Sequence, residues 1–488
     1  MIPKTIYRGL IGLFLAMCAN AAAFGQYMPT QSFNIPLSYA SLGGDAYRLA
    51  IQVGINGGPL QSYLFDTGSP GFNAAYNPST WNGFGGGSTT SVPASTLPNG
   101  TNVQLCYGST SAPGTCRGYM GNIVQVPSLS FQTPGGGLTT LTTPPAGGFV
   151  MTAVSGDNSA SQSPPLVFPG YFCDSPYSCA HPNPTPPDEN LFYGIFGAGN
   201  FTAMVYGCSV SLPTQCPSST GSGPVIGSVL GQIAVQNPNV VAQGFVVAAN
   251  GQPNVAVGGG VSNPPTGNAA VTIGGVSNVQ VTNCNPCVTV GLTPQLIGQF
   301  AAVGLASDRA HAGLIPWAQT GAHPFPNPYG TTPGNNTSTE TGANFAVSVT
   351  GTSSTQSQVA PGLLDTGTPG ISLNESLSSA GTPTAISIAG TTQSGDAIAG
   401  LPTMSADLSS TNGSYSAHYI ETNHNTIGLP FFMQNSVLMD FSGKAIGYTP
   451  YFVTDAPLVT TANGPLIVSG ANVPLGLAGV ISGPGGLV

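Results

Sequence analysis

The sequence predicts an all-β protein of two lobes with a few short helices. Short segments rich in Val, Ile, Phe or Tyr recur along the chain, bounded by Gly, Pro, Asn or Ser, and this pattern is typical of strands and turns. Segments with helical periodicity are few. The 488 residues are enough for two domains, and one short motif occurs in each half of the chain.

The expected strands are short and spread over the whole chain. They are residues 47–53, 62–65, 123–126, 245–249, 271–273, 279–282, 345–349, 437–441 and 445–448. The best helical candidates are residues 229–236, 294–303 and 374–379. Two stretches, 133–187 and 321–344, are expected to be surface insertions because they are long and lack periodicity.

The composition excludes several classes of protein. Only 4% of the residues are charged, against about 25% in an ordinary soluble domain. Past residue 25 no apolar run reaches the length of a membrane span, so we expect no stable membrane insertion. Six basic residues and a net charge of −9 leave no basic patch for nucleic acid. Glycine and proline are abundant but lack the period of collagen.

Residues 1–25 are expected to be a secretory signal peptide. Lys4 and Arg8 form a basic start, residues 10–19 are largely apolar, and residues 21–23 offer a small-x-small cleavage site. A lipoprotein signal at Cys18 is the lesser alternative. The expected location is therefore secreted, either extracellular or periplasmic. The mature chain would carry so few basic groups that self-repulsion in acid is weak, and we expect the fold to persist at low pH.

Eight cysteines follow Cys18, and they fall into four close couples. These are Cys106 and Cys116, Cys173 and Cys179, Cys208 and Cys216, and Cys284 and Cys287. Disulfides between neighbours are one hypothesis among many connectivities, consistent with an oxidising compartment. Cys284 and Cys287 also have the spacing of a redox or zinc motif, but no second such pair and no histidine pair accompanies them. We therefore predict no metal site and no cofactor.

The repeated motif is the most informative feature of the sequence. Residues 64–71 read Leu-Phe-Asp-Thr-Gly-Ser-Pro-Gly, and residues 363–370 read Leu-Leu-Asp-Thr-Gly-Thr-Pro-Gly. Two chance copies of the central tetrapeptide have a probability on the order of one in a thousand. Two ordinary Asp-Gly turns are the simpler alternative, but they do not explain the shared flanks.

Such a pair of motifs has a definite chemistry. Two carboxylates brought within a few ångströms cannot both ionise, so Asp66 and Asp365 would share one proton. The ionised member would act as general base on a water, and the protonated member as general acid. The loops would be supported by the residues that follow each aspartate: Thr67, Gly68 and Ser69, and Thr366, Gly367 and Thr368.

These residues resemble the pepsin-like aspartic proteases, with a divergent, bacterial-type secreted member as the nearest description. Residues 105–110 and 118–126 resemble the flap of that family, which assigns Tyr107, Gly108 and Ser109 to substrate contact. Residues 193–199 resemble the segment threaded behind the first catalytic loop. Residues 314–317 resemble the strand before the second loop, and residues 427–448 the closing segment.

The resemblance implies two β-barrel-like lobes related by a pseudo-two-fold axis. The expected boundaries are 1–25 for the signal peptide, 26–275 and 276–455 for the lobes, and 456–488 for a Gly/Pro-rich tail. It further implies a monomeric aspartic endopeptidase that hydrolyses an extended polypeptide.

One departure leaves an alternative open. Asn73 stands where the family has a tryptophan that supports the flap tyrosine, and Trp81 or Tyr76 would have to replace it. A catalytically inactive pepsin-like binding or surface protein is therefore the alternative function. A β-solenoid adhesin is disfavoured because no short regular repeat exists.

Overall fold

The structure is a computed structural model of the full chain, and it describes parts of both expected lobes. The described residues are 32–41, 47–69, 71–76, 81, 102–107, 117–134, 137–142, 149–157, 173–175, 178–179, 192–199, 202–204, 206–208, 225–233, 241–249, 270–273, 276–280, 286–301, 315–316, 343–392, 395–398, 401–408, 417–420, 425–441, 445–449, 458–459 and 481–482. Within these residues, no helix has the length and apolar character needed to cross a membrane. The expected signal peptide lies outside them.

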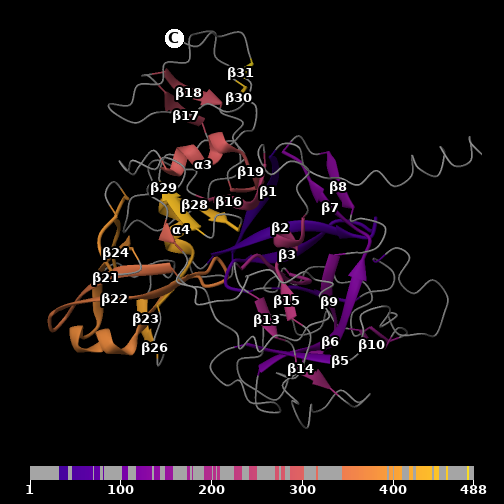
Figure 1. The fold of residues 1–488 in the computed structure, drawn as a ribbon, viewed down its shortest axis with the longest axis horizontal. Coiled ribbons are helices and arrows are strands. Elements are labelled where there is room, and N and C mark those ends of the chain that lie inside the picture. Colours follow the sequence, from indigo (N-terminus) through magenta and orange to yellow (C-terminus); the bar gives the residue numbers. More distant parts are fainter. Residues whose placement is uncertain are drawn as a thin grey trace, which may run out of the picture.

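The described chain is mostly β-structure, and it forms two lobes (Figure 1). A large sheet contains the strands of the first lobe and continues into the middle of the molecule, and a separate seven-stranded sheet forms the second lobe. In Figure 1 the second-lobe strands, in orange, lie to the left of the indigo and magenta strands of the first lobe. The expected all-β, two-lobed fold is confirmed.

The centre of each lobe repeats one topology of five strands. In the first lobe the order is β2 (Tyr47–Ile55), β3 (Gln61–Asp66), β12 (Gly194–Gly197), β4 (Phe72–Ala75) and β9 (Phe149–Asp157). In the second lobe it is β21 (Ala343–Gly351), β22 (Thr355–Leu364), β27 (Asn425–Ile427), β23 (Ile371–Asn374) and β26 (Ala417–Ile420). Neighbours pair antiparallel, parallel, antiparallel and parallel in both lobes. The duplicated motif therefore lies within a duplicated fold.

The hairpin that leads to the first motif follows from local sequence. Asn56 and Gly57 both have positive φ, 50° and 76°, which is the backbone of a tight type I′ turn and is tolerated best by Asn and Gly. The Gly58 N–H donates to the Ile55 carbonyl at 3.0 Å and closes the turn. After this turn β3 pairs with β2 in a register that places Ala50 opposite Leu64.

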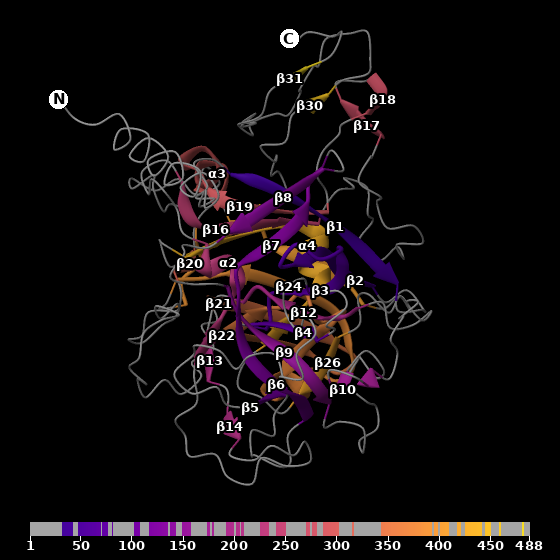
Figure 2. The same cartoon turned by 90° about the vertical axis from the view of Figure 1, so that its right-hand side faces the viewer.

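A layer of strands joins the lobes. β1 (Phe33–Ser41) pairs with β2 through its second half and with β19 (Cys287–Leu292) through its first half. Beyond β19 follow β16 (Ala242–Ala248), β28 (Ser436–Asp440) and β29 (Ala445–Thr449). Figure 2 shows β1, β16 and β19 above the central strands β3, β12 and β4 of the first lobe. This layer mixes segments from both sides of residue 275, and the lobe boundary at that residue stays a prediction.

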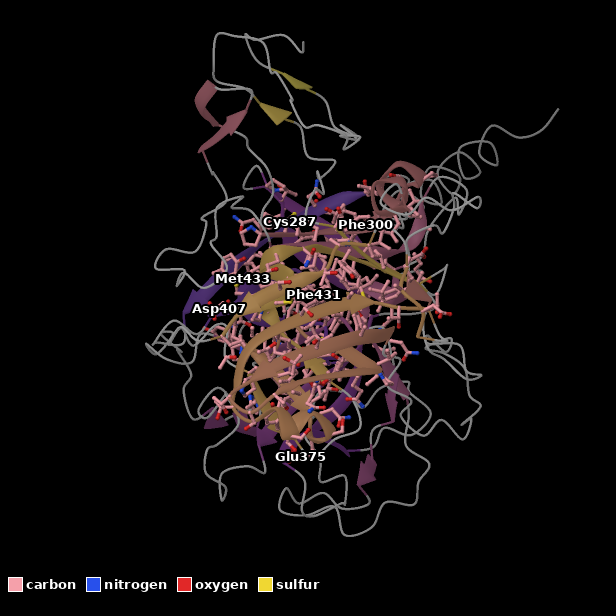
Figure 3. The ribbon with its side chains drawn as sticks, turned by 90° about the vertical axis from the view of Figure 1, so that its left-hand side faces the viewer. Cys287, Phe300, Glu375, Asp407, Phe431 and Met433 are labelled. Carbon is pink, nitrogen blue, oxygen red and sulfur yellow. The ribbon has the colours of Figure 1, made fainter. Side chains whose placement is uncertain are left out.

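The core is aromatic on both sides of the lobe interface. Phe65 stacks on Phe196 at 6.2 Å between ring centroids, and Phe72 lies 5.0 Å from Phe196. In the second lobe Phe431 lies edge-on to Tyr448 at 5.0 Å. Figure 3 shows Phe431 and Met433 behind the orange strands, with Glu375 at the opposite end of the view from Cys287 and Phe300.

The helices differ in part from expectation. α2 (Val229–Gln232) begins where expected but ends sooner, and α3 (Pro294–Ala301) begins where expected, with residues 302–303 outside the described residues. The third expected helix is a 3₁₀ helix, η2 (Glu375–Ala380), capped by the Asn374 side chain. A further short helix, α4 (Leu429–Gln434), was not expected as a helix.

One expected strand has a different role. Residues 314–317 contribute only β20 (Ile315–Pro316), which pairs with β29, and β22 is the strand that leads into Asp365. Ile315–Pro316 form a strand before the second loop, and the β21–β22 hairpin follows between this strand and the motif.

The remaining strands complete the sheets and the short hairpins. They are β5 (Asn102–Tyr107), β6 (Arg117–Val126), β7 (Ser128–Gln132), β8 (Leu138–Thr142), β10 (Cys173–Ser175), β11 (Ser178–Cys179), β13 (Thr202–Met204), β14 (Tyr206–Cys208), β15 (Val225–Gly227), β17 (Ala270–Ile273), β18 (Val276–Gln280), β24 (Pro383–Gly390), β25 (Met404–Asp407), β30 (Leu458–Val459) and β31 (Ile481–Ser482).

Candidate active site

The first motif forms a loop at the end of β3, and β12 passes behind it. The Ala198 N–H donates to the Asp66 carbonyl at 2.7 Å, and the Gly199 N–H donates to the Ser69 carbonyl at 2.8 Å. Gly197 lies so close to the backbone of Gly71 that a Cβ there would collide with it. The loop is therefore held from behind, as the resemblance of residues 193–199 implied.

The second motif is also held from behind by a threaded segment, residues 427–429. This role of theirs was not predicted from the sequence. The Asp365 N–H donates to the Ile427 carbonyl at 2.9 Å, and the Leu429 N–H donates to the Thr368 carbonyl at 2.8 Å. Gly428 packs against the backbone of Gly370 and leaves no room for a Cβ. Residues 427–429 thus do for the second loop what residues 196–198 do for the first.

The two loops are locked to each other by their threonines. The Thr67 hydroxyl donates to the Leu364 carbonyl, and the Thr366 hydroxyl donates to the Phe65 carbonyl, both at 2.7 Å. Each hydroxyl also accepts the backbone N–H of the other threonine, at 3.1 and 3.0 Å. All four bonds are buried, so they fix the relative position of the loops in a region that excludes water.

This lock brings the two carboxylates together. Asp66 and Asp365 are in side-chain hydrogen-bond contact. A Cβ added to Gly68 would collide with the Asp365 carboxyl group, and one added to Gly367 would collide with that of Asp66. Each glycine thus makes room for the aspartate of the other loop.

The remaining carboxylate oxygens are held by matching donors. On Asp66, Oδ1 accepts the Gly68 N–H at 2.8 Å and Oδ2 accepts the Ser69 hydroxyl at 2.5 Å. On Asp365, Oδ1 accepts the Gly367 N–H at 2.7 Å and Oδ2 accepts the Thr368 hydroxyl at 2.5 Å. These bonds orient both carboxyl groups in one arrangement.

The two aspartates differ in their surroundings. Asp66 is 7% exposed, whereas Asp365 is partly exposed. Burial, then the charge of Asp365 and the hydrogen bond that protonated Asp66 donates to it, raise the pKa of Asp66 well above its ordinary value; Ser69 and Gly68 oppose this by donating to the carboxylate. The pair therefore favours one shared proton.

The expected flap is present as a backbone hairpin. β5 pairs antiparallel with β6, and Tyr107 lies opposite Arg117 at the end where the connecting loop begins. The side chain of Tyr107, together with Gly108 and Ser109, lies outside the described residues. Their contact with substrate therefore stays a prediction.

The position of the absent tryptophan is occupied by a buried polar side chain. Asn73 is 1% exposed, and its amide donates to the Gly71 carbonyl at 3.3 Å. Trp81 and Tyr76 pack edge-on at 5.3 Å within the core. Their support of Tyr107 stays a prediction.

The cysteine couples are only partly described. Cys173 and Cys179 lie directly opposite each other in the β10–β11 hairpin, and Cys287 is buried at the start of β19. Cys106 and Cys208 lie in β5 and β14, whereas Cys116, Cys216 and Cys284 are outside the described residues. The four expected pairings stay predictions. Within the described part of the chain, no three His, Cys, Asp or Glu side chains are grouped so as to hold a metal ion.

Sequence reasoning missed two contributors to the site. The role of Gly428 was signalled by the apolar-Gly-apolar pattern that residues 427–429 share with residues 196–198. Arg48, whose guanidinium interacts electrostatically with both aspartates, carried no signal except its register against β3.

Three solved structures are similar to this chain. They are an aspartic proteinase from Irpex lacteus (14% identity, 86% of this chain and 97% of that one, TM-score 0.40), edgp (10%, 87% and 96%, 0.41) and Basic 7S globulin from soybean (11%, 86% and 97%, 0.42). No protein-family model and no curated protein matches the sequence. At these identities and TM-scores, function does not follow from the likeness.

Proposed function

We propose that this protein is a secreted aspartic endopeptidase of the pepsin-like type. The observation that supports it most directly is the pair of carboxyl groups in mutual hydrogen-bond contact, held by mirrored donors from two duplicated loops. Secretion is proposed from residues 1–25.

The proposed reaction divides the acid and base roles between the two aspartates. Asp365, the more exposed member, takes a proton from a water while that water attacks the carbonyl carbon of a peptide bond. Asp66 donates its proton to the carbonyl oxygen, so the tetrahedral intermediate is neutral. Breakdown returns one hydroxyl proton to Asp66 and passes the proton on Asp365 to the leaving nitrogen, which restores the starting state.

The surroundings of the pair suit this reaction. A buried carboxyl group with a raised pKa retains its proton at pH values where an exposed carboxyl group is ionised. The substrate is proposed to be an extended polypeptide, because main-chain hydrogen bonds from the β5–β6 hairpin would hold such a chain across the loops. Tyr107 would close over it.

The test is cleavage of a denatured protein by the purified chain between about pH 3 and 6, where such a pair holds one proton. Asp66→Asn and Asp365→Asn should each reduce kcat by about 10³-fold or more, since the two groups act as a unit. The exposed Asp407→Asn is the matched control and should leave the rate unchanged.

The inactive binding protein is the outcome that would replace this proposal. Intact wild-type protein that neither cleaves a denatured substrate nor binds a statine-type transition-state mimic would favour it. Activity that survives either aspartate substitution would exclude the mechanism.

A further inference from the structure

Arg48 lies on the strand next to the first aspartate and on the same face of the sheet. On β2 the side chains of Leu49, Ile51 and Val53 are fully buried in the core. Successive side chains of a strand alternate between faces, so Arg48 projects from the other face. The register that places Ala50 opposite Leu64, continued by two residues, places Arg48 opposite Asp66.

The guanidinium of Arg48 is an unusual buried charge. Its Nη1 is buried and has no hydrogen-bond partner within the described part of the chain. A buried polar group without a partner costs free energy, so its presence needs a physical explanation. Burial lowers the pKa of Arg48, while the carboxylates of Asp365 and Asp66, in that order of strength, raise it.

The described residues named next, which pack around the two aspartates, carry no second positive charge. The facing residue of β1 is Ala40, and the threaded segments behind the loops contribute Gly197 and Ala198, and Gly428 and Leu429, none of which titrates. Among the residues whose side chains the structure describes, Arg48 is the cation whose charge interacts with both carboxyl groups.

We propose that Arg48 is a positioning residue of the site, whose positive charge keeps one carboxyl group of the pair ionised in acid. This rests on the proposed function. A cation favours the ionised form of a neighbouring carboxyl group, so it moves both ionisations of the pair to lower pH. The active form carries one proton on the pair. With the cation present, this form would persist to lower pH than burial of Asp66 alone would allow.

The experiment compares pH profiles of kcat/KM, using the full chain and a peptide substrate without ionisable side chains. In Arg48→Met both limbs of the profile should move to higher pH by about one unit, because the pair loses its cation. Arg48→Lys should restore both limbs to within about 0.3 unit of wild type. Gln52→Met, a half-buried and uncharged position on the same face of β2, should leave them unchanged.

A second readout separates this inference from the proposed function. Titration of ¹³C-labelled aspartate carboxyl groups by NMR, assigned with Asp66→Asn and Asp365→Asn, should show the same upward shift in Arg48→Met even if the chain cleaves nothing. The inference would be overturned if Arg48→Met left the pH profile and the aspartate titrations unchanged. It would also be overturned if Arg48→Lys displaced them as much as Arg48→Met does. If Arg48→Met does not fold, Arg48→Gln provides the same comparison with a polar side chain.

Discussion

The two lobes hold their Asp-Thr-Gly loops in the same way with different sequences. The two loops differ in the burial of their aspartates, the property that bears on the chemistry. Both hold an Asp-Thr-Gly loop by threading an apolar-Gly-apolar segment behind it, although that segment follows the aspartate by about 130 residues in the first lobe and by about 60 in the second. The hydrogen bonds of Thr67 and Thr366 match one for one. The asymmetry lies in burial: Asp66 is buried, whereas Asp365 is partly exposed.

This comparison suggests that symmetry builds the site and that local burial assigns the roles. If so, substitutions in the shared frame should have equal effects in the two lobes. Substitutions of the two aspartates should have unequal effects on how the free energy of unfolding depends on pH.

The largest expected effect is at the threaded glycines. Gly197→Val and Gly428→Val should each destabilise the protein by more than about 4 kcal/mol, because a side chain would collide with backbone that cannot move. Thermal unfolding and soluble yield measure this. Gly298→Ala, in α3 with open space around it, is the control and should be neutral or stabilising by up to about 1 kcal/mol. A near-native melting temperature for either valine variant would show that the corresponding loop is not threaded.

The next largest effect is expected at the threonine lock, the four buried hydrogen bonds of Thr67 and Thr366. Thr67→Val and Thr366→Val should each cost about 2 to 4 kcal/mol of unfolding free energy, since each leaves a buried N–H and a buried carbonyl without a partner. Their double variant should lose less than the sum, because both changes break one network. Thr384→Val removes an exposed bond of the same kind and should cost under about 0.5 kcal/mol. Strictly additive losses would mean that the two lobes are not coupled through this lock.

The greater burial of Asp66 should be visible in how the free energy of unfolding depends on pH. The pKa of Asp66 is raised on folding, so the native state binds more protons than the unfolded state at intermediate pH, and the free energy of unfolding falls as pH rises above the unfolded value. Asp66→Asn removes this cost and should therefore stabilise the protein at pH 7 by about 1 kcal/mol or more, with little effect below about pH 3. Urea unfolding at both pH values measures it, with Asp407→Asn as the exposed control. Destabilisation by Asp66→Asn that grows between pH 3 and 7 would contradict the assignment.

The smallest expected effect concerns the hydroxyl donors. Ser69 and Thr368 make the same bond, at the same distance, to equivalent carboxylate oxygens. Thr368→Ser should therefore retain kcat within about threefold, whereas Thr368→Ala should lose about tenfold, the cost of one charge-assisted hydrogen bond. Equal losses in the serine and alanine variants would mean that the methyl group, and not the hydroxyl, is what matters there.

The sequence was sufficient for the features that depend on local order. Segments rich in Val, Ile, Phe or Tyr predicted strands, and the repeated motif indicated which residues form the two loops. α2 ends at Gln232, sooner than expected, because Ile233 has an extended backbone. The helix at Leu429–Gln434 was missed because its sequence, Leu-Pro-Phe-Phe-Met-Gln, has too few residues to show a period.

What the sequence by itself determined is the composition of the site: two aspartates, their hydroxyl and glycine neighbours, and the duplicated frame that carries them. The tertiary structure alone decided how these parts meet. Arg48 beside the pair, Gly428 behind the second loop and the unequal burial of the two aspartates all arise from strand pairings between distant segments. Such pairings set the local dielectric environment and the distances between charges, and neither quantity is encoded in any short stretch of residues.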